Sequence, residues 1–178
     1  TDLLYAAITK SGGVLVDKKN DNIEWGITGW LTLGSVPAVL LTLWFLSTLN
    51  TAPDAMNAII KQALGVVLLL TALAVFFKKR LLAFAHRRAG GNYNPSGASL
   101  NALTVVTGLV LGPMVALTSI GAGALGTVAL FILYPFLETR RLVGTEIAHA
   151  VPLTLVAGFG HASMGNMDWG VLGFLLIG

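Results

Sequence analysis

Residues 26–49 read GITGWLTLGSVPAVLLTLWFLSTL and contain no charged side chain. Three further runs are also uncharged: residues 62–77, residues 89–137, and residues 147–167, in which two histidines are the only ionisable groups. A helix that spans the hydrocarbon core of a bilayer needs about 20 mostly apolar residues, and several of these runs reach or exceed that length. The sequence therefore predicts an all-α integral membrane protein, built as a polytopic helix bundle.

The overall composition excludes a soluble protein. Only 11% of the residues are charged, 55% are hydrophobic, and the mean hydropathy is +0.80. In a typical soluble domain, about a quarter of the residues are charged. A soluble chain of this length would have to hide four apolar runs inside a small core, which its surface-to-volume ratio does not allow.

Several chemical classes are disfavoured as well. The chain has no cysteine, no metal-ligand spacing, and no nucleophile beside a plausible base, so we expect neither an enzyme nor a metal or cofactor site. The formal net charge is +3, but the basic residues flank apolar runs, where membrane topology places them. We therefore expect no nucleic-acid partner.

Positive charge predicts how the helices cross the membrane. We expect helices over residues 3–16, 26–49, 57–77, 100–118 and 146–163, a helix from the break at residues 119–123 to about residue 135, and another from about residue 169. Basic residues cluster in three connections: Lys18 and Lys19; Lys78, Lys79, Arg80, Arg87 and Arg88; and Arg140 and Arg141. Connection 50–57 has none. Cytoplasmic loops collect lysine and arginine, so we expect the three basic connections, including linker 78–99, inside and connection 50–57 outside.

The chain also repeats itself. A shift of 144 positions aligns residues 1–34 with residues 145–178, and Asn22, Trp25 and Gly26 then meet Asn166, Trp169 and Gly170. The first copy is expected to begin inward and the second outward, as in the inverted repeats of secondary transporters. We therefore assign residues 1–77 to a first repeat, 78–99 to a cytoplasmic linker and 100–178 to a second repeat. Because the sequence starts at Thr1 without a methionine and stops inside an apolar run, we expect both repeats to be incomplete.

A glycine-rich break interrupts the longest uncharged run. Residues 119–123 read SIGAG, and Gly121 to Gly126 matches the G-x-G-x-x-G dinucleotide fingerprint. That fingerprint needs a soluble βαβ unit, which this apolar setting does not provide. A helix that restarts after the break would instead point free backbone N–H groups into the protein, which suits an anion. Close packing of small residues, as expected for Gly108-x-x-x-Gly112, explains the glycines equally well.

Lys10 is a cation inside an apolar segment. A lysine at bilayer depth costs about 2.5–3.5 kcal/mol on insertion scales, so it is rare without a partner or a task. Lys10 and its neighbour Thr9 are therefore candidate contacts for an anionic substrate. The alternative is that the first helix is short and Lys10 extends to the inner surface.

Glu146 and His149 lie three residues apart and so share one face of a helix. A histidine that titrates near neutral pH suits coupling to a proton. Glu146 could instead mark the start of the helix, with Thr145 as N-cap. We expect the residues near the other helix ends (Glu24, Trp25, His161, Asp168 and Trp169) to anchor the membrane interface.

The later part of the chain resembles a known family. The stretches SIGAGALG at 119–126, LYP at 133–135, RLVGTEIAHAVPLT at 141–154, GFGH at 158–161 and GNMDW at 165–169 are similar to the second half of the TauE/SafE family. These proteins are sulfite-exporter-like anion permeases with two related halves. The resemblance covers nearly the whole chain and is most specific over residues 119–178.

This resemblance implies alternating-access transport of small sulfur-containing or organic anions, such as sulfite, sulfonates or sulfoacetate. We expect Ser119, Gly121 and Gly123, together with Thr9 and Lys10, to contact the anion. His149 and Glu146 are the candidates for coupling to a proton or sodium ion. The alternative is a non-transporting membrane subunit that docks a partner protein through linker 78–99.

Overall fold

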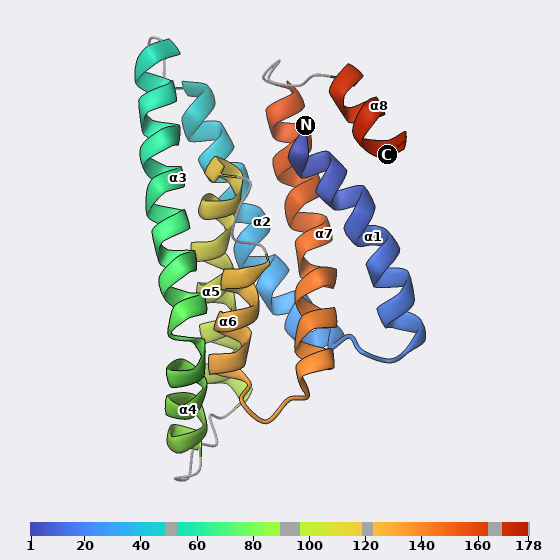
Figure 1. Cartoon of the computed structure of the whole chain (residues 1–178), viewed down its shortest axis with the longest axis vertical. Coiled ribbons are helices and arrows are strands. Elements are labelled where there is room, and N and C mark those ends of the chain that lie inside the picture. The colour runs from blue at the N-terminus through green and yellow to red at the C-terminus, as the bar shows by residue number, and fades with distance from the viewer. Residues whose placement is uncertain (49–52, 90–96, 119–122, 164–168, 178) are drawn as a thin grey trace.

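The computed structural model describes residues 1–178 except 49–52, 90–96, 119–122, 164–168 and 178. Every regular element in the described part is a helix (Figure 1). The helices are α1 (Asp2–Lys19), α2 (Trp25–Thr48), α3 (Pro53–Phe76), α4 (Lys78–Ala89), α5 (Gly97–Thr118), α6 (Ala124–Leu133), α7 (Thr139–Ser163) and α8 (Trp169–Ile177). The predicted all-helical membrane fold is confirmed.

Three helices, α2, α5 and α7, are long and apolar enough to cross a membrane. Residues 60–76 of α3 and the whole of α6 are shorter apolar helices. Large apolar side chains stay exposed on the outside of the bundle: Trp44 is 65% exposed and Phe76 is 81% exposed. A hydrocarbon environment accommodates such a surface, whereas water does not.

Several helix boundaries differ from those expected from the sequence, most clearly in the linker 78–99 and at the start of α7. The linker 78–99 begins with helix α4, in which basic residues flank the apolar stretch 81–85. Lysine, arginine, leucine and alanine are all good helix formers. Helix α7 begins at Thr139 rather than near Glu146. The charges of Arg140 and Arg141 suggest a loop, but arginine is a good helix former.

The three basic segments lie at one end of the bundle. Figure 1 shows the end of α1, the whole of α4 and the start of α7 at its lower end. The α1–α2 connection pairs there with Arg141, and Lys78 lies over the ring of Phe131 near the end of α6. This arrangement is the one that the predicted topology requires. That this end is cytoplasmic stays a prediction.

Helices α2 and α5 form the tightest contact in the bundle. A Cβ atom on Gly34 would clash with the carbonyl oxygen of Val105, and one on Gly108 would clash with that of Leu31. A Cβ atom on Gly112 would lie 2.6 Å from the carbonyl oxygen of Ser35. The glycines let the two backbones touch, which is how helices associate where no hydrophobic effect drives them together. The packing role expected for Gly108 and Gly112 is confirmed.

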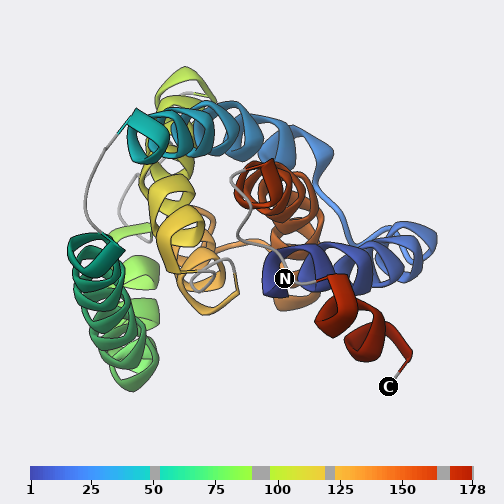
Figure 2. The ribbon, with the colours of Figure 1, turned by 90° about the horizontal axis from the view of Figure 1, so that it is seen from above.

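Helix α7 lies in the middle of the structure, with α1 on one side and α2 on the other (Figure 2). Helix α1 runs opposite to α7: Leu4 packs on Gly158, and Asp21 pairs with Arg141. Opposite directions are required by inverted repeats, although the division into repeats itself stays a prediction. Four helices, α1, α2, α5 and α7, contribute to one buried cluster, which includes Leu3, Val39, Val115, Ala150 and Leu153.

Helices α5 and α6 form a pair that enters and leaves at the same end. Helix α5 starts at the lower end of Figure 1, whereas α6 starts partway up and returns to the lower end. With ten residues, α6 is about 15 Å long, half of the roughly 30 Å hydrocarbon core. Helix α5, with 22 residues, is long enough to cross the whole core, so a full-length helix is followed by a half-length helix that returns toward the same end.

Candidate functional site

Helix α7 carries a row of buried polar side chains. Glu146 is 3% exposed and His149 is 1% exposed, and Thr145 and Thr154 are also buried. Glu146 lies two turns inside α7, because the helix begins at Thr139. The interpretation of Glu146 as the start of a helix, with Thr145 as its N-cap, is therefore wrong.

His149 is tied to a neighbouring helix. Its Nε2 atom lies 2.9 Å from the Oγ atom of Ser35 on α2, and Ser35 is fully buried. Either atom can donate this hydrogen bond, depending on the histidine tautomer. The bond holds the imidazole ring between α2 and α7.

Glu146 faces the first turn of α6, directly after the glycine-rich break. A Cβ atom on Gly126 would lie 3.1 Å from the Cγ atom of Glu146 and 3.3 Å from its Oε1 atom. A side chain at position 126 would press on the Glu146 side chain, which would have to shift by a few tenths of an ångström. The Oε1 atom is buried and has no hydrogen-bond partner among the described residues. An unpartnered buried carboxyl oxygen is costly and therefore suggests a role beyond packing.

Lys10 lies on α1, which packs against α7, the helix that carries Glu146 and His149. It is half-buried near the middle of α1, which extends from Asp2 to Lys19. Because the helix is longer than expected, Lys10 is far from either end of it, and the idea of a short helix that brings Lys10 to the inner surface loses support. We call Lys10, Ser35, Glu146 and His149 the α7 polar cluster.

The other residues predicted to contact the anion are not part of this cluster. The side chain of Thr9 is exposed on α1. Gly123 is exposed at the N-cap of α6, where its carbonyl oxygen accepts bonds from the backbone and hydroxyl of Thr127. Ser119 and Gly121 lie outside the described residues. Among the described residues, no cluster of acids and histidines could hold a metal ion.

Two members of the site were missed from the sequence. Ser35 lies in an uncharged run, where its only signal is a polar side chain one turn after the buried Leu31. The sequence marks Gly126 only as the last glycine of the rejected fingerprint and as the end of the family-like stretch 119–126, and neither gives it a contact. Its contact with Glu146 joins residues twenty positions apart on two helices, and no local pattern predicts such a contact.

A second polar group closes the lower end of the α1–α7 contact. The Arg141 guanidinium lies 2.8 Å from a carboxylate oxygen of Glu24 and 3.4 Å from one of Asp21. The backbone N–H of Glu24 donates to the hydroxyl of Thr145 at 2.9 Å, and this hydroxyl donates to the carbonyl oxygen of Arg141 at 2.6 Å. We call these four residues the lower clamp. Glu24, expected as an interface anchor, is thus an ion-pair partner as well.

We expect Arg141→Gln to loosen the lower clamp. Half-exposed ion pairs stabilise by up to about 1 kcal/mol, so amide hydrogen exchange at Asn22 and Glu24 should speed up by as much as about fivefold. Hydrogen exchange with mass spectrometry measures this change. The matched control is Arg140→Gln at the exposed neighbouring position, which should leave the exchange unchanged. Equal effects of the two variants would contradict a specific clamp.

His161 is bound within the bundle rather than only at the interface. Its Nε2 atom donates to the carbonyl oxygen of Ala116 on α5 at 2.7 Å. Ala116 lies two residues before the end of α5, so His161 links the upper part of α7 to the helix that leads into the break. Asp168 lies outside the described residues.

Comparisons with known proteins identify a family of membrane proteins. A family model described as "Sulfite exporter TauE/SafE" matches residues 1–178. The chain is 35% identical over 180 residues to a Bacillus subtilis (strain 168) protein described as "Probable membrane transporter protein YjnA". This match covers 100% of the chain and 69% of that protein. No solved structure matches the chain significantly.

Proposed function

Because this chain belongs to the sulfite exporter TauE/SafE family, we propose that it transports small anions. These anions would be sulfite, sulfonates or related organic anions, carried in an ion-coupled alternating-access cycle. The family and the relative both indicate a membrane transporter. The observation that carries the finer proposal is the unpartnered Oε1 atom of Glu146, buried against the first turn of the half-depth helix α6. Ionisable groups inside a membrane bundle mark substrate and ion pathways.

The anion is proposed to bind at the break before α6. The N-terminus of a helix carries free N–H groups and a partial positive charge. Gly123 would supply backbone contacts, as would Ser119 and Gly121, which lie outside the described residues. Lys10 would supply a full positive charge from α1. Broken helices near the middle of the membrane bind substrate in this way in other transporters.

Glu146 is proposed to couple this binding to a proton. An ionised Glu146 and a bound anion would both draw on the positive end of α6, and like charges at short distance disfavour each other. Protonation of Glu146 removes the competing charge. Anion and proton would therefore bind together and cross the membrane in the same direction, as in a symporter. His149, which is hydrogen-bonded to Ser35, is the second candidate for the proton. A sodium ion bound at Glu146 would neutralise the carboxylate in the same way.

Coupled changes of helix position follow from the same geometry. Helix α7 contacts α1, α2 and α6, and it carries Glu146, His149 and half of the lower clamp. A change of charge at Glu146 therefore acts on α6 through Gly126 and, through the adjacent Thr145, on the clamp that closes the lower end. A non-transporting docking subunit would have no use for such a buried polar cluster.

The test is flux into liposomes that contain the protein. Radiolabelled sulfite and a small panel of sulfonates would be measured under an imposed proton gradient, with sodium or choline as the other cation. We expect flux from the parent protein and a loss of at least about tenfold for Lys10→Met, because removal of a cation that pairs with an anion at depth costs more than about 1.4 kcal/mol.

The matched control is Lys61→Met, which removes an exposed lysine from α3 and should leave flux unchanged. Lack of flux for every anion tested would contradict the proposed substrate class. Full flux in Lys10→Met would exclude Lys10 from the site while leaving transport intact.

A further inference from the structure

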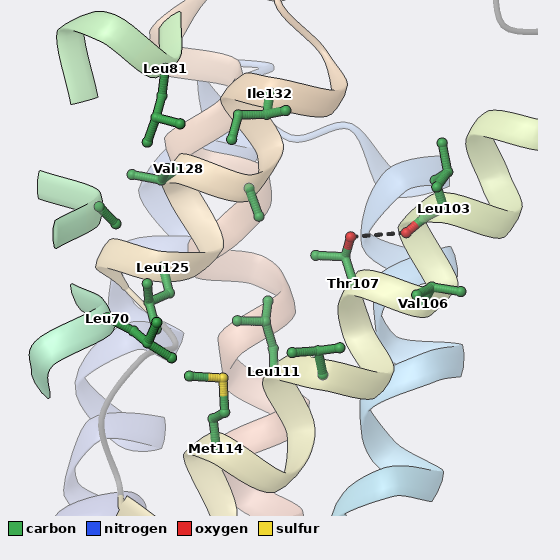
Figure 3. Close-up of a pocket in the computed structure, with 13 residues that line it drawn as sticks. Leu70, Leu81, Leu103, Val106, Thr107, Leu111, Met114, Leu125, Val128 and Ile132 are labelled. Carbon is green, nitrogen blue, oxygen red and sulfur yellow. Dashed lines mark hydrogen bonds between the residues drawn. The ribbon is translucent and has the colours of Figure 1, made fainter. Parts of the chain in front are cut away.

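A long apolar groove lies on the side of α5 and α6 away from the polar cluster. Figure 3 shows side chains from α3, α4, α5 and α6 around it, and its volume is about 460 Å³. The wall includes Leu70, Leu103, Met114, Leu125 and Val128. The one polar side chain in the wall, Thr107, donates its hydroxyl to the carbonyl oxygen of Leu103 at 2.9 Å. The groove therefore offers an apolar surface and is unsuited to a polar solute.

The groove continues along α3 toward the end of the bundle opposite α4. A second hollow of about 400 Å³ runs on between α3 and the end of α5, and Leu70 and Met114 line both. From Gln62 in this hollow to Lys78 at the lower end, α3 and the start of α4 extend for about 24 Å. That length is most of the roughly 30 Å thickness of a hydrocarbon core. The groove thus runs in the direction in which lipid tails lie.

Basic side chains stand at the lower mouth of the groove. Lys78 lines a small hollow there together with Leu81, Val128 and Ile132, and these three also line the main groove. The Nζ atom of Lys78 lies 5.3 Å from the centre of the Phe131 ring. Both ion pairs in the described part of the chain involve Arg141, so Lys78 has no carboxylate partner there. Lys79 and Arg80 are exposed beside it, and the stretch 78–89 contains no acid.

We propose that this groove binds one anionic phospholipid, with an acyl chain along α5 and α6 and the phosphate beside Lys78. The apolar wall selects a hydrocarbon chain, and the unpaired cations at its end select a negative headgroup. A second copy of the chain fits less well. A two-fold interface through this face would bring two basic α4 segments together, and like charges across an interface disfavour association.

This lipid site is separate from the proposed anion site, but both sites are next to helix α6. Helix α6 presents Gly126 to Glu146 on one side, and Leu125, Val128 and Ile132 to the groove on the other. A lipid chain in the groove would fill the space behind α6 and hold the helix against α7.

The experiment is a lipid titration of the purified chain in detergent, followed by native mass spectrometry. The probes are dioleoyl phosphatidylglycerol and dioleoyl phosphatidylcholine, which share their acyl chains and differ in headgroup charge. We expect phosphatidylglycerol to bind at least about fivefold more tightly. Lys78→Gln should lower this preference by about fivefold, and Lys61→Gln, at the far end of α3, should not.

A second pair of variants tests the acyl-chain part of the site. Val106→Trp places a large side chain in the groove at a half-exposed position and should weaken binding of both lipids. Val75→Trp, equally exposed on α3 but outside the groove lining, is the control and should bind both lipids normally. The unfolding midpoint of each variant without added lipid shows whether it is folded.

Equal binding of the two lipids by the parent chain would overturn the proposal. A Lys78→Gln variant that keeps the full preference for phosphatidylglycerol would also overturn it. So would a dimer that a Val106→Cys variant traps by a disulfide across this face. Because none of these measurements involves transport, failure here is distinguishable from failure of the proposed function.

Discussion

Replacement of Glu146 by glutamine is expected to abolish accumulation driven by a proton gradient. A gradient of one pH unit supplies about 1.4 kcal/mol per proton, which corresponds to about tenfold accumulation of a co-transported anion. Glutamine keeps the shape of the side chain beside Gly126 but cannot take up and release a proton. The variant should therefore lose this tenfold accumulation.

The same variant should keep exchange of the anion without a gradient. A neutral amide beside α6 resembles the protonated acid, so the anion would still bind at the break. Counterflow of labelled against unlabelled anion measures this ability. The variant should also be at least as stable as the parent, because an amide loses less on burial than an ionised carboxylate does.

The control is Glu138→Gln, at an exposed acid just before α7. It changes the net charge by the same amount and should accumulate the anion as the parent does. Retention of full gradient-driven accumulation by Glu146→Gln would exclude Glu146 as the coupling group and direct attention to His149. Loss of both accumulation and counterflow would instead indicate that Glu146 is needed for anion binding itself.

Substitution of Gly34 by alanine is expected to be among the most destabilising single changes in the chain. The added Cβ atom would meet the carbonyl oxygen of Val105, a backbone atom that cannot rotate away. Helices α2 and α5 would have to separate, and overpacking of this kind typically costs about 1–3 kcal/mol. The separation would also disturb Ser35, the next residue on α2 and the partner of His149.

Gly29 provides the matched control on the same helix. A Cβ atom there meets nothing within 4 Å, so Gly29→Ala should be neutral or should stabilise α2 by about 0.5–1 kcal/mol. Thermal unfolding in detergent compares the two variants with the parent. If Gly34→Ala and Gly29→Ala unfold at the same temperature, the α2–α5 contact is looser than the structure indicates.

The sequence was most informative where a membrane constrains it most. The uncharged run at 26–49 predicted α2 to within about one residue, and the run before Ser119 predicted the end of α5. Glycine spacing at Gly108 and Gly112 predicted a packed contact. These predictions succeed because length, charge and small residues decide which helices can lie in lipid at all.

The site was harder to predict, for a physical reason. Helices in a membrane are apolar on the lipid side as well as inside, so no contrast between faces reveals which side chains point inward. Glu146 and His149 stood out because they are polar, but their partners Ser35 and Gly126 come from other helices. The start of α7 was misplaced because two arginines suggested a loop. This error alone made Glu146 look like the beginning of a helix.

The position of Glu146 along α7 has a consequence for membrane voltage. Glu146 is seven residues from the start of α7, about 10 Å along the helix. With Thr139 taken at the membrane surface, this distance is about a third of the hydrocarbon core. A charge that crosses the whole field gains about 2.3 kcal/mol per 100 mV. A proton that reaches Glu146 from the lower end therefore meets only about a third of this energy, and one from the upper end meets the rest. Voltage would act unequally on the two half-steps of the cycle, so currents measured with opposite polarity should differ in steepness.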